Sequence, residues 1–288
     1  MDKKSAIGIF LVVIMLGSIL PLFFSGSSNN NNNQTNSPSE APGIDTIPGN
    51  KVSHQLNSIA DGLAMSPENI TSAQYVDYAK MHQSQLKIFV PNETELSTLY
   101  NVRLTKEFIA VDSNVPNGTD IALRMHEIEP KVVNFQYMAS NEPYKGYYLL
   151  SRSEEYYNVV GSPMLFGSKE SIENAIDVIS GDASGSHYFD RLLGYTDPGA
   201  EYQVLSSDNE LVADQYYLEF KALEEGGYAR TSLFMNLNES VLSDINSLAQ
   251  NSSMRGLEYN ITNNNDITKV IVKTNESNFF NLALEPSA

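Results

Sequence analysis

The chain has 288 residues, of which 18 are basic and 35 acidic, giving a formal net charge of −17. This balance argues against a nucleic-acid-binding protein, because neutralising phosphates requires clustered Lys and Arg side chains. It also argues against a protein that docks flat on anionic lipid. The absence of cysteine excludes disulfides, thiolate metal sites and Cys nucleophiles.

Residues 6–24, "AIGIFLVVIMLGSILPLFF", carry no charge. As a helix they are ~28 Å long, close to the ~30 Å thickness of the bilayer core. Lys3 and Lys4 precede the segment, and the next basic residue is Lys51. Because positive residues stay on the cytoplasmic side, we expect residues 1–5 inside the cell and everything after residue 24 outside. The sequence therefore predicts a single-pass signal-anchor helix in the cell membrane.

Two alternatives for this segment remain open. Ser25 and Ser27 are small enough for the cleavage site of a secretory signal peptide, although an apolar core of 19 residues exceeds the 7–15 typical of such peptides. A cut after "KKSA", before Ile7, would instead resemble an archaeal pilin leader and make the protein a pilin-like filament subunit. Pilins usually continue this helix directly into the head domain, whereas a polar tether follows here. We favour the anchor.

Residues 25–50 consist mainly of Ser, Asn, Pro and Gly. Such a composition buries too little apolar surface to offset its ordering entropy, so we expect a disordered linker. A flexible coil of this length separates its ends by roughly 25–30 Å, which holds a folded head away from the membrane.

Asn-x-Ser/Thr sequons are frequent beyond the predicted anchor. An extracytoplasmic location would expose each of them to a glycosylation machinery. An Asn-rich composition is the alternative explanation for their number. The candidate N-glycosylation sites are Asn33, Asn69, Asn92, Asn117, Asn238, Asn251, Asn260 and Asn275.

The first half of the head, residues 51–195, alternates predicted strands with short helices. Val52, Leu56, Ile59, Ala60 and Leu63 lie on one face at helical spacing, which predicts a short helix with Ser53 as its N-cap and Gly62 as its end. "SKESIENAIDVISG" predicts a second helix, with Ser168 as N-cap and Gly181 after its end. A shorter helix is expected over 187–193. Strands are expected at 73–79, 107–112, 120–128, 132–138, 144–151 and 157–167.

The second half, residues 196–288, is predicted to follow a similar plan. Strands are expected at 201–205, 213–220, 228–237, 256–262 and 267–274, with helices over 240–250 and near 275–284. The links between strands are too short for parallel crossovers, which favours antiparallel pairing. The predicted fold class is therefore α+β, a mainly antiparallel sheet with a few packed amphipathic helices and two similar halves, 51–195 and 196–288.

The stretch "VVGSPMLFGSKESIENAIDVISGD", together with "GAEYQVL" and "ADQYYLEF", resembles uncharacterised membrane-anchored cell-surface proteins of methanogenic archaea. A strand, then Phe-Gly-Ser, then a helix ending "DVISG" is also similar to a broader bacterial and archaeal family of unknown function. The likeness spans most of residues 52–284. It implies a fold and a surface location, and none of its motifs carries chemistry.

No catalytic or metal-binding constellation is predicted. "HEIE" at 126–129 lacks the second His of a zinc-protease helix and falls on a strand, so we expect surface polar residues there. Ser84 and Lys87 match the Ser-x-x-Lys pattern of some acyl-transfer enzymes at no more than chance frequency. "GDASGSHYFD" at 181–190 has oxygen ligands but lacks the spacing of a calcium loop, and we expect a helix–helix turn.

Three adjacent tyrosine pairs, Tyr147–Tyr148, Tyr156–Tyr157 and Tyr216–Tyr217, are each expected to place one ring in the core and one in solvent. Exposed rings are suited to stacking on sugars or partner proteins. We therefore expect a non-enzymatic cell-surface binding or envelope-interaction protein without cofactors. Its expected partners are the lipid bilayer, through residues 6–24, and other envelope proteins or surface glycans, with no nucleic acid. The alternative is an extracytoplasmic hydrolase whose site is built from dispersed carboxylates.

Overall fold

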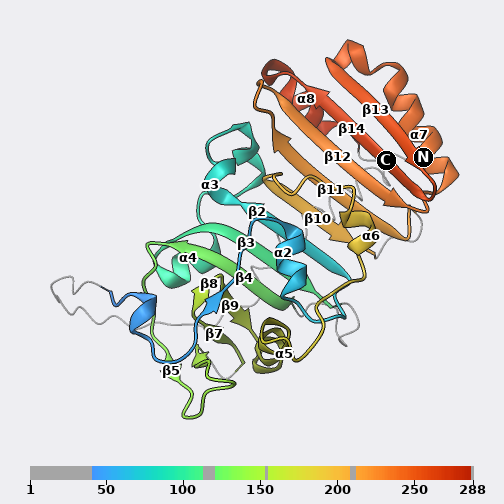
Figure 1. Ribbon diagram of the computed structural model, residues 1–288. Coiled ribbons are helices and arrows are strands. Elements are labelled where there is room, and N and C mark those ends of the chain that lie inside the picture. Colours follow the sequence, from blue (N-terminus) through green and yellow to red (C-terminus); the bar gives the residue numbers. More distant parts are fainter. Residues whose placement is uncertain (1–40, 113–120, 153–154, 208–211, 287–288) are drawn as a thin grey trace.

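The computed structural model describes residues 41–112, 121–152, 155–207 and 212–286 (Figure 1). The predicted anchor at 6–24, residues 25–40 of the predicted linker, and the sequons Asn33 and Asn117 lie outside the described residues. Within the described ranges, no helix combines the length and the apolar character that crossing a bilayer requires.

A twelve-stranded sheet forms the centre of the molecule, in the order β13-β14-β12-β11-β10-β2-β3-β4-β9-β7-β6-β5, and all its neighbouring strands are antiparallel. A separate parallel pair joins β1 to β8. The strands are β1 Val52–Ser53, β2 Ser72–Asp77, β3 Arg103–Val111, β4 Ile121–Glu129, β5 Met138–Ala139, β6 Leu150–Ser151, β7 Tyr157–Val159, β8 Gly161–Ser162, β9 Met164–Gly167, β10 Tyr202–Ser206, β11 Gln215–Ala222, β12 Tyr228–Met235, β13 Leu257–Asn264 and β14 Ile267–Thr274.

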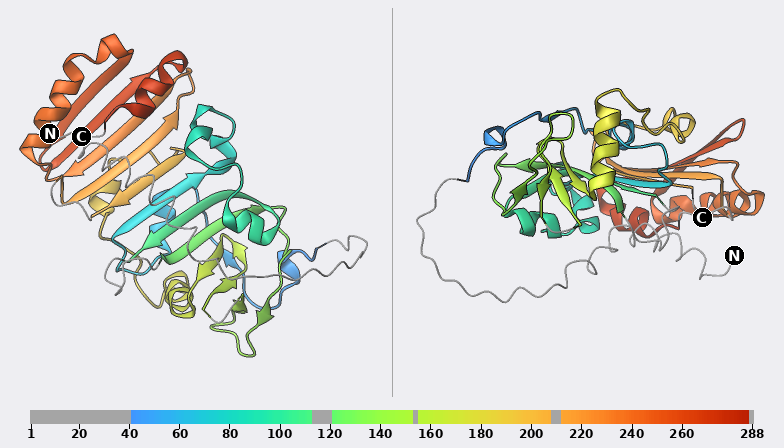
Figure 2. Two further views of the ribbon diagram at one scale, coloured as in Figure 1. Left: turned by 180° about the vertical axis from the view of Figure 1, so that it is seen from behind. Right: turned by 90° about the horizontal axis from the view of Figure 1, so that it is seen from below.

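Short helices cover both faces of this sheet (Figure 2). The α-helices are α2 Ile59–Ala64, α3 Tyr78–Met81, α4 Glu95–Tyr100, α5 Lys169–Ile179, α6 Asp190–Leu193, α7 Glu239–Gln250 and α8 Phe279–Leu284. The 3-10 helices are η2 Ile44–Thr46, η3 Gln85–Phe89, η4 Ser252–Arg255 and η5 Glu276–Asn278. The predicted α+β class with a mainly antiparallel sheet is confirmed.

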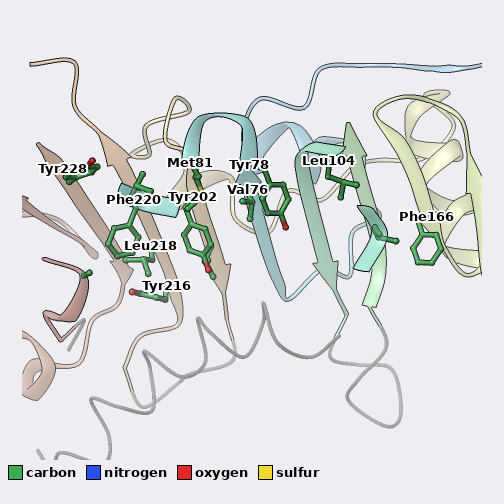
Figure 3. Close-up of a cluster of buried hydrophobic side chains, with 14 of the residues drawn as sticks. Val76, Tyr78, Met81, Leu104, Phe166, Tyr202, Tyr216, Leu218, Phe220 and Tyr228 are labelled. Carbon is green, nitrogen blue, oxygen red and sulfur yellow. The ribbon is translucent and has the colours of Figure 1, made fainter. Parts of the chain in front are cut away.

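We call the two faces of the sheet the α5 face and the α4 face. On the α5 face, α2, α5 and α6 contribute buried side chains to one hydrophobic cluster. On the α4 face, α3, η3, α4, α7 and α8 contribute to a second cluster, part of which is shown in Figure 3. Because both faces are covered, central strands such as β2 and β10 are buried at nearly every position and lose the alternation of a half-exposed strand.

The predicted halves meet within the sheet. β2 of the first half pairs with β10 of the second, with Gln74 opposite Val204. The sheet is therefore continuous across residue 195, and the assignment of two halves as separate units stays a prediction.

Helix α5 forms as the sequence predicts. The hydroxyl of Ser168 accepts a hydrogen bond of 3.1 Å from the backbone N–H of Ser171, which caps the first turn. Ile172 and Ile176 are fully buried against the sheet. Gly181 follows the helix with a φ of 79°, a left-handed conformation that glycine adopts without steric cost.

The helix expected over 52–63 is shorter than predicted. It begins at Ile59, and its N-cap is Ser58, whose side chain accepts a bond from the backbone N–H of Asp61. Val52 lies in β1, and the buried Leu56 belongs to the irregular segment between them. Gly62 lies inside the helix and not at its end. A glycine is needed there because a Cβ atom would come within 2.3 Å of the ring of Phe108. The apolar residues that are spaced as in one helix therefore belong to two different elements, β1 and α2, and to the segment between them.

Three predicted strands are also shortened. Only Met138–Ala139 and Leu150–Ser151 pair in the regions expected to hold strands at 132–138 and 144–151. The strand expected over 157–167 is divided into β7, β8 and β9. Pro163 lies at the division between β8 and β9, where its missing N–H cannot contribute to a ladder.

Residues 41–50, assigned to the disordered linker, are instead ordered. They include η2, and Ile44 and Ile47 are buried in the cluster of the α4 face. The backbone N–H of Val133 donates to the carbonyl of Pro42 at 2.8 Å, and Gly43 forms a bridge with Val132. Two buried isoleucines and these backbone contacts hold a segment whose average composition is polar, so the linker prediction is wrong for these ten positions.

The remaining elements agree with the prediction within a few residues. The strand expected at 73–79 ends at Asp77, whose carboxylate accepts a bond from Lys80 N–H and caps α3. The helix expected over 187–193 is present only at 190–193. The strands expected at 107–112, 120–128, 201–205, 213–220, 228–237, 256–262 and 267–274, and the helices at 240–250 and near 275–284, are confirmed as β3, β4, β10, β11, β12, β13, β14, α7 and η5–α8.

Candidate binding groove

An open groove of about 750 Å³ lies beside α4, at the end of the sheet where β3 begins. Pockets of ~300–1,000 Å³ are typical of small-ligand sites. The side chains that line it are mostly polar, and only a few are apolar. The residues that line the groove are Tyr78, His82, Pro91, Asn92, Glu93, Thr94, Ser97, Thr98, Asn101, Val102, Arg103, Leu104 and Pro130.

Helix α4 forms one wall of the groove. Thr94 and Ser97 make a reciprocal capping box: the Thr94 hydroxyl accepts from Ser97 N–H at 3.0 Å, and the Ser97 hydroxyl accepts from Thr94 N–H at 2.9 Å. Tyr100 is fully buried and fastens the helix to the sheet. Asn101 ends the helix in a left-handed conformation with a φ of 51°. The wall facing the groove therefore presents hydroxyl and amide groups on a fixed backbone.

Tyr78 and His82 contribute aromatic surface to the groove. Their rings stack with centroids 6.5 Å apart and an interplanar angle of 24°. The Tyr78 hydroxyl donates to Oε2 of Glu107 at 2.7 Å, which fixes the orientation of its ring. Burial and the neighbouring Glu107 carboxylate raise the pKa of Tyr78. Tyr78 is thus held as a neutral ring, whereas His82 is exposed.

Behind Tyr78, the α4 face of the sheet holds a buried polar cluster. Glu107 is opposite His126 in the β3–β4 ladder, and Arg124 lies two residues along the same strand. The Nε atom of Arg124 is 3.9 Å from Oε1 of Glu107. His126 is fully buried and stacks on Tyr100 at a centroid distance of 5.2 Å. The cluster contacts the groove through Tyr78, which lines the groove and donates to Glu107.

His126 has no hydrogen-bond partner on either ring nitrogen among the described residues. Burial, with a smaller effect of the positive charge on Arg124, lowers its pKa to about 3. The imidazole is therefore neutral at physiological pH. The expectation that "HEIE" at 126–129 lies on the surface is wrong for His126, because the α4 face is covered by helices, and holds for the exposed Glu129.

The groove has little net charge. Among its lining residues, Glu93 and Arg103 carry a formal charge of opposite sign. Arg103 also forms an ion pair with Glu129, its partner in the β3–β4 ladder, and both side chains are more than 60% exposed, at 66% and 64%. Because the rim carries a neutralised pair, the groove is suited to a neutral polar ligand better than to an ion.

The other sequence motifs have structural roles in the fold. Ser84 caps η3 by accepting from Leu86 N–H at 3.2 Å, and Lys87 lies inside that helix. The stretch 181–190 links α5 to α6, and the ring of His187 bonds to Asp190 at 2.8 Å. Within the described ranges, no group of three or more His, Asp and Glu side chains is arranged to hold a metal ion.

Several carboxylates lie close together on the α5 face, but each already bonds to another group of the protein. Burial raises the pKa of Glu219, and its carboxylate accepts from the hydroxyl of Tyr217 at 2.6 Å and from Asp197 N–H at 3.1 Å. Glu201 accepts from Ala222 N–H at 3.1 Å. The side chain of Asp197 pairs with Lys221 at 2.5 Å. These contacts tie the loop before β10 to β11.

The tyrosine pairs do not place one ring each in solvent. Tyr216 and Tyr217 are both buried, at 8% and 0% exposure. The rings of Tyr148 and Tyr156 pack on the α4-face cluster, and those of Tyr147 and Tyr157 on the α5-face cluster. Adjacent rings do face opposite sides, as expected, but helices or loops cover both sides. That part of the prediction is wrong.

Six predicted glycosylation sites fall among the described residues, and all six asparagines are exposed: Asn69, Asn92, Asn238, Asn251, Asn260 and Asn275. Asn92 lines the groove. Asn238 and Asn275 cap α7 and η5 with their Oδ1 atoms, which accept backbone bonds of 3.0 and 3.1 Å. Glycosylation of these residues stays a prediction.

The fold and groove thus define an α+β protein built on one long antiparallel sheet. Residues 55–180, less than half of the chain, match the family model AF_2048_N, described as a family N-terminal domain. This match agrees with the predicted resemblance to a family of unknown function. No curated protein matches the chain.

Three crystal forms of TP0453 are similar to this chain in structure. Form I is 8% identical with a TM-score of 0.44, form III 11% with 0.43, and form IV 11% with 0.46. Each match covers 77% of this chain, and 95%, 98% and 95% of the respective TP0453 chain.

Neither the groove nor the buried cluster was predicted from the sequence. Their residues come from three separate stretches, around Tyr78, Ser97 and Pro130, which only the β2–β3–β4 pairing brings together. One signal was available: "NETELS" contains a capping-box pattern, Thr94 followed by Ser97, that marks the start of α4.

Proposed function

We propose that the protein is a membrane-anchored, extracytoplasmic and non-enzymatic binding protein, and that the groove beside α4 receives a neutral polar ligand of the cell envelope. A surface glycan is the ligand class that we favour. The groove itself carries the proposal, because its volume of about 750 Å³ and its mixture of hydroxyl, amide and aromatic groups suit a sugar. Residues 6–24 would supply the anchor.

The composition of the groove supports this ligand class over others. Sugar hydroxyls need both donors and acceptors, and the side-chain amide of Asn101 provides both. The hydroxyl of Thr98 donates to the carbonyl of Thr94 at 3.2 Å and can still accept a bond from a ligand. The faces of sugar rings are apolar and pack on aromatic rings, and the exposed ring of His82, which stacks on the buried Tyr78, provides such a surface. A strongly anionic ligand would need more cationic groups than Arg103, which Glu129 already pairs.

Substitution of the groove is expected to weaken binding of oligosaccharides about tenfold or more, equivalent to the loss of one or two hydrogen bonds and a stacking contact. The variants are His82→Ala, which removes the exposed ring, and Thr98→Arg, which fills the groove from α4. The measurement is the affinity of the full chain in detergent for an array of neutral oligosaccharides. His187→Ala is the matched control, since His187 is also exposed but lies on the link between α5 and α6. Equal affinities for wild type and both groove variants would contradict the proposal.

The location is tested separately. Protease added to intact cells is expected to remove the head while a cytoplasmic marker protein stays intact, because residues 25–288 are predicted to lie outside the membrane. The fragment that remains with the membrane should contain residues 6–24. If the whole chain resists protease until the cells are broken, the predicted orientation is wrong.

A further inference from the structure

The two edges of the twelve-stranded sheet differ in how they are protected. Proteins usually prevent unwanted pairing at an edge with very short strands, bulges, prolines or lysines. At one edge, β5 has only two residues. At the other, β13 has eight residues, pairs with β14 without a register shift, and has no other strand beside it in the described part of the chain. Its sequence, "LEYNITNN", contains no Pro or Lys and a single charge, Glu258.

The β13–β14 hairpin determines which backbone groups of β13 point outward. Asn264 is opposite Ile267, so the turn contains two residues. Residues that flank a two-residue turn form a hydrogen-bonded pair, and the pattern then alternates along the ladder. The N–H and C=O groups of Asn264, Thr262, Asn260 and Glu258 thus point to β14. Those of Leu257, Tyr259, Ile261 and Asn263 point away from the sheet.

The side chains of β13 divide between the two faces. Tyr259 and Ile261 are half-buried against the cluster of the α4 face, beside the positions that α7 and α8 cover. Glu258, Asn260 and Thr262 are exposed on the other face. The outermost strand, visible beside β14 in Figure 1, therefore has an apolar side that is only partly covered.

We propose that β13 pairs in antiparallel fashion with β13 of a second copy of this chain, about a two-fold axis through Asn260. A two-fold axis perpendicular to the sheet keeps the α4 faces of both copies on the same side of the joined sheet. Each β13 residue must therefore lie opposite a residue of the other copy whose side chain is on the same face. With the axis at Asn260, Tyr259 of each copy lies opposite Ile261 of the other, and Glu258 of each copy lies opposite Thr262 of the other. The outward backbone groups of Leu257, Tyr259, Ile261 and Asn263 exchange hydrogen bonds.

Self-pairing in this register is favoured by its side-chain pairs. Aromatic and β-branched residues directly opposite each other stabilise antiparallel sheets, and like charges do not meet. An axis at Ile261 would instead set Tyr259 against the polar Asn263 and Glu258 against Asn264. The Asn260 pair at the axis is a non-hydrogen-bonded pair with closely spaced side chains. An N-glycan on Asn260 would occupy this position, so glycosylation there and pairing exclude each other.

The absence of native cysteine allows a direct test of this register by disulfide formation. In the Asn260→Cys variant, the two cysteines lie at the axis with Cα atoms about 4.5 Å apart, within the range of a disulfide. In Thr262→Cys, the matched control, the two cysteines lie about 13 Å apart. Both substitutions remove the same sequon. Upon mild oxidation of the full chain in detergent, we expect a covalent dimer of the first variant and little of the second. Equal cross-linking of both, or cross-linking of neither, would overturn the proposal.

A second pair of variants tests the edge without cysteine. Proline at an outward-facing position removes an unpaired N–H and leaves the β13–β14 ladder intact. Asn263→Pro is therefore expected to halve the mass of the wild-type dimer measured by light scattering, with an unchanged circular dichroism spectrum, whereas Thr262→Ala remains dimeric. A monomeric wild type would contradict the pairing. The groove lies by β3, six strands from β13, so this result is independent of the proposed ligand.

Discussion

Replacement of Arg255 by Met is expected to lower the free energy of unfolding by about 3 kcal/mol, because it leaves the buried Glu285 carboxylate without its cation. The Nε and Nη2 atoms of Arg255 donate to the two oxygens of Glu285 at 3.1 and 2.6 Å. The Glu285 side chain is only 4% exposed. Tyr259 would remain as a donor to the same carboxylate.

This contact holds together the C-terminal end of the fold. Arg255 also donates to the carbonyls of Leu248 and Asn251 at the end of α7, at 2.8 and 3.2 Å. The buried Arg230 of β12 donates to the carbonyls of Glu285 and Pro286. Two arginines thus attach the last described residues to α7 and to the sheet.

The control is a pair with the same charges at the surface. Lys169 and Glu173 lie 3.7 Å apart on α5, and the Lys169 side chain is 63% exposed. Lys169→Met is therefore expected to change stability by less than about 0.5 kcal/mol. Urea unfolding followed by circular dichroism measures both variants, and a double variant with Glu285→Leu should cost less than the sum of the single changes. Similar small losses for Arg255→Met and Lys169→Met would show that the contact at Glu285 contributes little.

Acid is expected to destabilise the wild type about 3 kcal/mol more than a His126→Phe variant between pH 7.5 and pH 4. The pKa of His126 is lowered to about 3 in the folded protein, mainly by burial. An unfolded chain binds a proton at this residue below pH ~6.5. The folded state cannot take up that proton until about pH 3. Stability due to the neutral imidazole is thus present above pH ~6.5 and lost as the pH falls.

Phenylalanine keeps the stacking of the ring at position 126 on Tyr100 and removes the titrating group. Urea unfolding at pH 7.5 and pH 4 gives the change in unfolding free energy for the wild type and for the variant. Subtracting one change from the other cancels the effects of other carboxylates and histidines. His126→Leu, a second apolar variant, should show the same reduced pH dependence even if its stability at pH 7.5 is lower. Parallel pH dependences for the wild type and both variants would mean that His126 gains a proton in the folded state as readily as in the unfolded one.

The elements predicted best from the sequence are those whose defining residues all lie within one short stretch. Helix α5 has its cap at Ser168, its apolar stripe and its terminal Gly181 within one short stretch, so no distant residue is needed to define it. The long strands β11, β12 and β14 were predicted equally well. Their β-branched and aromatic residues favour strands whichever neighbour they pair with.

Elements that depend on distant contacts were predicted less well. Val52 and Leu56 appear helical in spacing, yet β1 pairs with β8, which lies more than a hundred residues further along the chain. His126 was assigned to the surface because nothing in its own stretch indicates that α4 covers that part of β4. The groove depends in the same way on the strand pairing that brings Pro130 to Tyr78 and α4.

The most direct test of the proposed binding site is hydrogen–deuterium exchange of the full chain in detergent, with and without the neutral oligosaccharides that bind best. We expect slower exchange confined to residues 78–104 and to the segment around Pro130, which together form the groove. Unchanged exchange throughout these segments, or slower exchange only at the β13 edge, would contradict the groove as the binding site.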